Sequence, residues 1–157
     1  MRILGIYPGT ATTGFGVIDA DKGRYTFVAA GVITTKPDLL MPERLSQIHA
    51  DLTELVAEFK PVAAAIEMLF FGTNVTTAMT VGQARGVALL VLHNAGLPIA
   101  EYNPMQVKLA IAGYGGAKKP QMQEMVKMLL GLTAIPKPDD AADALAIAIT
   151  HANSIKT

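Results

Sequence analysis

The sequence predicts a single α/β domain over residues 1–157. Short β-like runs alternate with helical ones, and no internal repeat, low-complexity tract or linker separates them. The chain is 157 residues long and 51% of these residues are apolar, which is enough for one sizeable hydrophobic core. These observations favour a folded domain over a disordered chain.

Five runs have the composition of β-strands; they cover residues 3–7, 14–19, 25–35, 62–66 and 99–102. The first three follow one another closely enough to form an antiparallel meander. The fourth is entirely apolar, as in a strand buried on both faces, and it stops at Glu67. We therefore expect a five-stranded mixed sheet of three antiparallel and two parallel strands, flanked by helices.

Helical patterns cover residues 42–59, 73–94, 104–112, 120–130 and 140–153. The first has its apolar residues on one stripe and ends before Pro61. In the second, Ala78, Gly82 and Gly86 form a face of small residues that suits tight packing, either on the domain's own sheet or on a second subunit. Asn103 is predicted to cap the third helix.

Composition and charge narrow the class of protein. The net charge is zero, so composition alone does not indicate a nucleic-acid binder. Residues 104–137, however, contain five lysines and one acid, which form either a solvated helix face or a surface for an anionic partner. The chain has no cysteine, no apolar run long enough for a signal peptide and no stretch of ~18 apolar residues for a membrane span, so we expect a cytoplasmic protein.

Asp140 and Asp143 lie three residues apart at the start of the last predicted helix. Residues at that spacing have Cβ atoms about 5–6 Å apart on one helical face. Acidic residues are also favoured in a first helical turn, so capping explains Asp139 or Asp140 well and Asp143 less well. The other interpretation is a metal site, because oxygen ligands without nearby His or Cys favour Mg²⁺ or Mn²⁺.

Glu67 follows the fourth predicted strand, and Tyr7 ends the first. Sites in open α/β sheets form outside the carboxyl ends of parallel strands, so we expect Glu67 at such a site, near Asp140 and Asp143. A buried Glu67 paired with a lysine is the structural alternative. Three acids brought together from distant parts of the chain repel one another, which favours a metal-binding role.

Five ordered motifs run through the chain, at residues 5–10 (GIYPGT), 66–67 (IE), 81–87 (VGQARGV), 102–108 (YNPMQVK) and 140–151 (DAADALAIAITH). Together they resemble the RuvC family of Holliday junction resolvases, whose fold is ribonuclease H-like. The resemblance covers essentially the whole length. It is far more specific than any one of the motifs.

The resemblance implies a dimeric, Mg²⁺-dependent endonuclease of DNA recombination and repair, with Mn²⁺ able to substitute and two ions in each active site. Such an enzyme binds four-way DNA junctions, cuts two strands of like polarity symmetrically and works with branch-migration proteins. The family's catalytic and metal-binding carboxylates fall on position 7 and on Glu67, Asp140 and Asp143. No membrane partner is implied.

Position 7 departs from the family pattern, which has Asp in GIDPG where this chain has Tyr7. A neutral phenol with an unperturbed pKa near ~10 is a poor Mg²⁺ ligand, and its ring fills space next to the expected metal. We therefore expect cutting by this chain to be reduced or abolished. Asp139 is the neighbouring acid that could substitute as a ligand, but it lies on a different segment.

DNA contacts are carried over from the family by position. Phe70 matches an aromatic residue that stacks on or wedges between bases, and Phe71 is its rival; a core Phe is the alternative. Lys108 and Lys119 match basic residues that hold the scissile phosphate. Arg85 is a further candidate, for which a salt bridge on a helix face is an equal explanation.

Two other functions remain open. One is a junction-binding protein that has lost cutting, which only Mg²⁺-dependent cleavage distinguishes from the nuclease. The other is a nucleotide-binding domain of the actin and sugar-kinase type, because residues 5–14 also resemble the first phosphate loop of that class. That class needs two such domains around its nucleotide, and a chain of this length supplies one.

Overall fold

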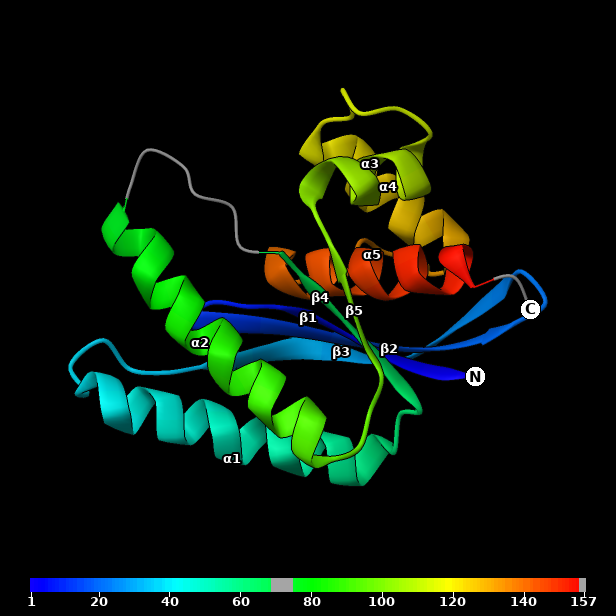
Figure 1. The fold of residues 1–157 in the computed structure, drawn as a ribbon. Helices are drawn as coiled ribbons and strands as arrows, with labels where there is room; N and C mark the ends of the chain where they lie inside the picture. The colour runs from blue at the N-terminus through cyan, green and yellow to red at the C-terminus, as the bar shows by residue number, and fades with distance from the viewer. Residues whose placement is uncertain (69–74, 156–157) are drawn as a thin grey trace.

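The computed structural model describes residues 1–68 and 75–155, and its central feature is one five-stranded sheet in the order β3-β2-β1-β4-β5 (Figure 1). The strands are β1 (Arg2–Tyr7), β2 (Thr12–Asp21), β3 (Arg24–Thr34), β4 (Ala63–Glu67) and β5 (Ile99–Tyr102). β1, β2 and β3 are antiparallel neighbours, whereas β4 is parallel to both β1 and β5. The predicted mixed sheet is therefore confirmed.

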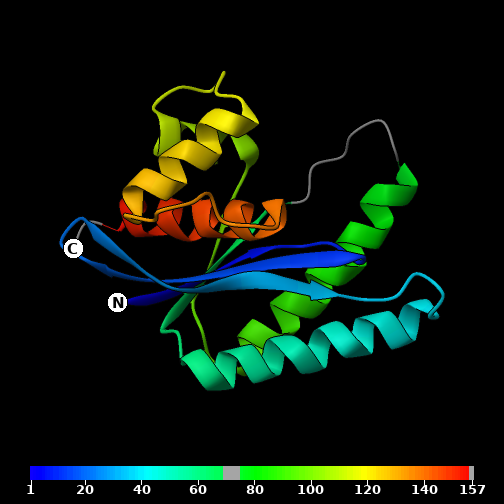
Figure 2. The ribbon, with the colours of Figure 1, turned by 180° about the vertical axis from the view of Figure 1, so that it is seen from behind.

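Helices cover both faces of the sheet (Figures 1 and 2). One face carries α1 (Met41–Phe59) and α2 (Val75–Asn94), and the other carries α3 (Pro104–Ala112), α4 (Lys119–Leu129) and α5 (Asp139–Ser154). Side chains alternate along β1, because successive residues of a strand point to opposite faces. Ile3 packs in the core under α5, whereas Leu4 and Ile6 pack in the core under α1 and α2.

Two glycines let α5 lie directly on the sheet. A Cβ atom at Gly5 would stand 2.2 Å from the carbonyl oxygen of Ala144, and one at Gly14 would stand 2.1 Å from that of Asp140. Real Cβ atoms do not approach main-chain atoms so closely, and α5 could not move away without opening the core. Because Gly5 on β1 and Gly14 on β2 have no side chain, α5 can lie close to the sheet at these two positions.

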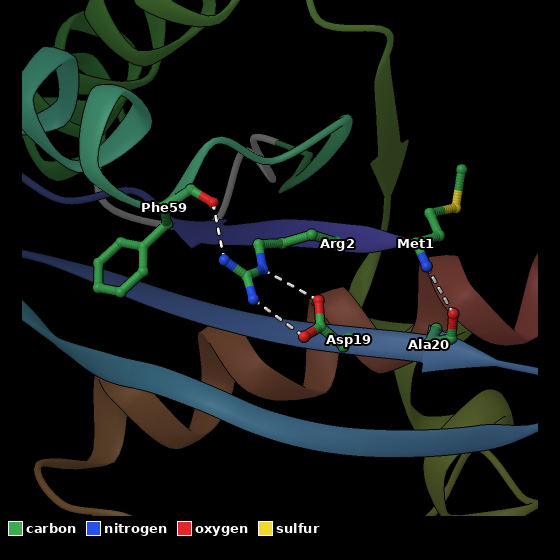
Figure 3. Close-up of polar contacts among 5 residues, drawn as sticks. All are labelled: Met1, Arg2, Asp19, Ala20 and Phe59. Carbon is green, nitrogen blue, oxygen red and sulfur yellow. Dashed lines mark hydrogen bonds and ion pairs between the residues drawn. The ribbon is translucent and has the colours of Figure 1, made fainter.

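The first strand is anchored at its start by polar contacts (Figure 3). Arg2 donates from Nε and Nη2 to both carboxylate oxygens of Asp19 on β2, at 2.9 and 3.0 Å. Its Nη1 donates to the carbonyl oxygen of Phe59, the last residue of α1, at 3.0 Å. The amino group of Met1 donates to the carbonyl oxygen of Ala20 at 2.8 Å. These contacts fix β1 at the end opposite to Tyr7.

The predicted elements agree with the structure to within a few residues at their ends. β2 is longer than predicted, because it continues to a tight turn at Lys22 and Gly23, where both residues have positive φ, and β3 begins and ends one residue earlier than predicted. Val62 lies outside β4 and is 52% exposed, so the fully buried strand begins one residue later than predicted. Asn103 caps α3 through a reciprocal capping box with Gln106, as its sequence predicted.

One helix among the described residues, α2, is long and apolar enough to span a membrane by length and composition alone. Its Ala84, Ala88 and Leu92 are buried in the core that α1 and α2 share with the sheet. Packing within the domain accounts for these apolar residues.

Candidate active site at the ends of β1 and β4

Tyr7 and Glu67 end two neighbouring parallel strands. The register pairs Ile6 of β1 with Ile66 of β4, so the next residues, Tyr7 and Glu67, leave the same edge of the sheet. Both side chains are half-buried and line one pocket. The structure thus places Glu67 at the carboxyl end of a parallel strand, as its sequence position predicted.

The first turns of α5 bring Asp140 and Asp143 to the same edge. The carbonyl oxygen of Asp140 lies over Gly14, which is paired with Tyr7 across β1 and β2. Asp143 is half-buried and lines the pocket together with Tyr7 and Glu67. Asp140 is not one of the described residues that line this pocket. The helix therefore directs Asp143, rather than Asp140, into the pocket.

Burial and like charges disturb the protonation of these groups. Burial, followed by the negative charge of Asp143, raises the pKa of Glu67 to about 7. Burial also raises the pKa of Asp143 to about 6, opposed by the positive charge of Lys119 and assisted by the other acids of α5. Burial and the charges of all three acids raise the pKa of the Tyr7 phenol far above its usual value. Tyr7 is therefore neutral at physiological pH.

The donor chemistry at this edge fits a hard divalent cation, since carboxylate oxygens are the ligands that Mg²⁺ and Mn²⁺ prefer. The raised pKa values of Glu67 and Asp143 are those of crowded acids that a cation would stabilise in their charged forms. Within residues 1–68 and 75–155, however, no three His, Cys, Asp or Glu side chains lie close enough to hold a metal ion. The donor type fits a metal, and the ligand set is incomplete, with a phenol at position 7.

The pocket extends from these acids to the space between α3, α4 and α5, and its volume is about 520 Å³. Its walls include the buried apolar residues Val107, Val126 and Ile147. Three lysines line it as well, and these are Lys108, Lys118 and Lys119. Acids on one side and lysines on the other suit a ligand that combines a phosphate with a metal ion.

Lys119 forms an ion pair with Asp139, from Nζ to Oδ2 at 3.2 Å. Asp139 also accepts a hydrogen bond from Gln123 at 3.2 Å and lies 3.7 Å from the Lys137 ammonium. The Lys119 ammonium holds the pKa of Asp139 below its usual range. Asp139 is thus bound to lysines rather than turned to the pocket, which argues against its use as a substitute metal ligand. The N-cap of α5 is Pro138 rather than an acid, and no side-chain capping hydrogen bond is made at that position.

Arg85 lies on α2 and forms an ion pair with Glu101 of β5. Its Nε also donates to the main-chain oxygen of Glu67, at 3.3 Å. These contacts are of the kind expected from the salt-bridge explanation of Arg85. Arg85 is not one of the described residues that line the pocket.

Two of the predicted DNA contacts, Phe70 and Phe71, lie outside the described residues. Lys118 and Gln123 are polar residues of the pocket that were not predicted as site residues. Lys118 lies in the lysine-rich region of residues 104–137 and directly precedes Lys119, so its local charge could have indicated it as a site residue. Gln123 carries no such signal, because its place at the pocket depends on how α4 packs against α5.

Comparison with known proteins gives one consistent result. The family model of the crossover junction endodeoxyribonuclease RuvC matches residues 3–151. A protein of that name from Chloroflexus aurantiacus is 56% identical over 157 residues, covering 100% of this chain and 96% of its own length. One from Rubrobacter xylanophilus is 59% identical over 152 residues, covering 97% of this chain and 85% of its own length.

Solved structures agree with these relatives. The Thermus thermophilus RuvC structure superposes with a TM-score of 0.91 at 41% identity, over 98% of this chain and 94% of the other. The same protein in complex with a Holliday junction substrate gives a TM-score of 0.94 at 39% identity, over 99% and 95%. The yeast mitochondrial resolvase Ydc2 shares the fold, with a TM-score of 0.70 at 15% identity over 96% of this chain and 78% of the other.

Proposed function

The chain belongs to the RuvC family of crossover junction endodeoxyribonucleases, and on that premise we propose that it binds four-way DNA junctions and hydrolyses their phosphodiester bonds in recombination and repair. The match covers residues 3–151, so this proposal concerns the whole fold rather than one motif. The relative solved with a Holliday junction superposes over 99% of this chain, which supports the junction as substrate.

One observation carries the proposal: Tyr7, Glu67 and Asp143 meet in one pocket that also contains lysines. A cation would stabilise the charged forms of these buried neighbouring acids, and lysines beside them attract a phosphate. The same observation supports a proposed limit on activity. Tyr7 is the residue of this group that brings no negative charge, so we propose that cutting is reduced or abolished by Tyr7.

Nucleases of this family depend on a divalent metal ion. We propose Mg²⁺, with Mn²⁺ as a substitute and two ions in each site, held by Glu67, Asp140 and Asp143 and by the side chain at position 7 where that residue is Asp. When bound, such ions activate a water molecule and stabilise the leaving oxygen in an in-line displacement. The chain's own contribution is to gather the acids and to exclude bulk water from the buried part of the pocket.

The DNA backbone is proposed to lie along the lysine side of the pocket. Lys108 and Lys119 are proposed to hold the scissile phosphate, and Lys118 to add to the same cationic rim. Phe70 or Phe71 is proposed to stack on bases at the junction. Arg85 was a further candidate for DNA contact, and its ion pair with Glu101 gives it a different role, which is argued below.

A second candidate function is a junction-binding protein without cutting activity. Tyr7 is the specific observation in its favour, because a neutral phenol stands where the family has a carboxylate. The match to the RuvC model over nearly the whole chain supports both of these candidates over a nucleotide-binding domain of the actin and sugar-kinase type.

We also propose that residues 1–157 act as a single nuclease domain, in the cytoplasm, as a homodimer that works with branch-migration proteins. The exposed apolar residues of α2 support the dimer: Val75 is 66% exposed and Met79 is 62% exposed. Gly86, on the same helix, has open space where a side chain would lie, which leaves room for a partner helix.

The experiment that tests the function uses a labelled synthetic four-way junction, with this chain and with Tyr7→Asp, each in Mg²⁺, in Mn²⁺ and in EDTA. Binding and cleavage are measured separately. We expect both proteins to prefer the junction over linear duplex and only Tyr7→Asp to cut it efficiently. A lack of junction preference in both would refute the proposed function, and equal Mg²⁺-dependent cutting by both would refute the part assigned to Tyr7.

A further inference from the structure

We infer that Arg85, held by Glu101, is a positioning residue that fixes the end of β4 and thereby aims Glu67 into the pocket. The inference rests on the proposed function, since it assigns to Glu67 a role as metal ligand. It differs from a DNA contact, because Arg85 acts through the main chain of the protein rather than through the phosphate of a substrate.

The first observation is the hydrogen bond from Arg85 Nε to the main-chain oxygen of Glu67, at 3.3 Å. Glu67 is the last residue of β4, and its register partner on β5 is Tyr102. On the other side, the pairing of β4 with β1 ends at Ile66. The guanidinium therefore supplies a donor at the place where pairing with β1 stops, one residue before the strand ends.

The second observation is that Arg85 is itself fixed. Its guanidinium forms an ion pair with the carboxylate of Glu101 on β5, and its side chain is 18% exposed. Ala88, three residues further along α2 and on the same side of the helix, is buried in the core beneath the sheet. An arginine held between a carboxylate and a main-chain oxygen keeps its planar group in one orientation.

The third observation is that Arg85 and the pocket lie on opposite faces of the sheet. The buried residues of α2 belong to the core shared with α1, whereas the pocket lies among α3, α4 and α5. Arg85 therefore reaches the end of β4 from one face while the Glu67 side chain enters the pocket on the other. Removing a group that hydrogen-bonds to a metal ligand typically weakens metal affinity by about 10–100-fold.

The test compares Arg85→Gln, Arg85→Lys and Glu101→Ala in the Tyr7→Asp protein. Lys108→Gln serves as the control for a phosphate contact, and Arg24→Gln, on the exposed β3 edge, serves as the control for a surface arginine. Three quantities are measured for each: junction affinity and its salt dependence in EDTA, the Mg²⁺ concentration for half-maximal single-turnover cutting, and amide hydrogen exchange in peptides that cover residues 63–68.

A positioning role predicts that Arg85→Gln and Glu101→Ala both raise the half-maximal Mg²⁺ concentration by about tenfold and both speed exchange over residues 63–68. Arg85→Lys recovers part of the effect, because a lysine can still pair with Glu101. Junction affinity in EDTA changes by less than about threefold in all three. Lys108→Gln shows the opposite pattern, with weaker binding and a smaller salt slope.

The inference is overturned if Arg85→Gln weakens junction binding and lowers the salt slope by about one, as Lys108→Gln does, while Glu101→Ala does neither. It is also overturned if exchange over residues 63–68 is unchanged in both variants. If Arg85→Gln does not fold, Arg85→Lys and Glu101→Ala give the same comparison. If the Tyr7→Asp parent does not cut, the proposed function fails, and hydrogen exchange still decides the role of Arg85.

Discussion

The ammonium of Lys119 lies 3.2 Å from the carboxylate of Asp139, at the rim of the pocket. The two side chains are 55% and 48% exposed, so solvent screens their attraction and the pair contributes little to the stability of the fold. A lysine that is proposed to hold a phosphate is therefore occupied by an internal carboxylate when no DNA is bound. Replacing the Asp139 carboxylate by a DNA phosphate as the partner of Lys119 therefore costs little free energy.

Asp139→Asn is expected to strengthen junction binding by about threefold, because it frees Lys119 and removes a negative charge beside the phosphate. Fluorescence anisotropy with a labelled junction in EDTA measures this. Glu54→Gln, an exposed acid of α1 on the opposite face of the sheet, is the matched control and should change affinity less. Equal gains in the two variants would show that only the net charge matters.

Glu67→Gln is expected to remove part of the pH dependence of stability in EDTA. The pKa of Glu67 is raised from 4.5 to about 7 in the folded chain, so the folded state binds this proton more tightly than the unfolded state. Its contribution is complete below the unfolded pKa and is lost as the pH rises through about 7, a decrease of about 1–2 kcal/mol after solvent screening.

Urea unfolding at a series of pH values measures this effect, with Glu54→Gln as the control. Asp143 keeps its own dependence, since its pKa is raised to about 6. The native chain should therefore lose stability relative to Glu67→Gln as the pH rises. A stability difference between the two that is constant across this range would contradict the assigned pKa shift.

Gly14→Ala is expected to destabilise the fold by about 1–3 kcal/mol or more, because the new Cβ would stand 2.1 Å from the carbonyl oxygen of Asp140. Chemical denaturation measures the change in the free energy of unfolding. Gly116→Ala is the control, since a Cβ there meets Tyr114 at an ordinary 3.6 Å. If both variants unfold at the same denaturant concentration, α5 does not lie as close to β2 as described.

Tyr7→Asp is expected to make stability depend on Mg²⁺. Without metal, a further carboxylate beside Glu67 and Asp143 adds repulsion, so the variant should unfold more easily than the native chain. Free Mg²⁺ at ten times its dissociation constant should then raise the free energy of unfolding by about 1.4 kcal/mol. Thermal unfolding in EDTA and in Mg²⁺ measures both effects, with Na⁺ at equal ionic strength as the control. An equal Mg²⁺ shift in the native chain would show that Tyr7 does not prevent metal binding.

Met79→Asp is expected to convert the proposed dimer into a monomer, because it places a charge among the exposed apolar residues of α2. Light scattering at micromolar protein measures the mass. Met128→Asp is the matched control, since Met128 is 69% exposed on α4, on the other face of the sheet. A native chain that is already monomeric under these conditions would refute the dimer itself.

Much of the fold could be predicted from the sequence because its local signals agree with one another. The apolar run that becomes β4, the N-cap at Asn103, and the stripe around Ile48 and Leu52 each have one good structural solution. The sheet edge that holds Tyr7 and Glu67 followed from strand order and from the rule that sites lie at the ends of parallel strands.

The geometry of the site could not be predicted, because it depends on contacts between distant segments. No periodicity in the sequence reveals that Asp140 would lie over Gly14, or that Asp139 would turn to Lys119. Arg85 illustrates the same point. Its partner Glu101 lies on another element and appears only when α2 and β5 are placed side by side.

The site takes its residues from both ends of the sequence, Tyr7 on β1 and Asp140 and Asp143 on α5. During synthesis, the pocket cannot form until the last of these has left the ribosome and α5 has packed on β1 and β2. A chain that stops before residue 139 would lack α5, the helix that carries Asp140 and Asp143. Incomplete products of translation would therefore lack two of the acids of the candidate site.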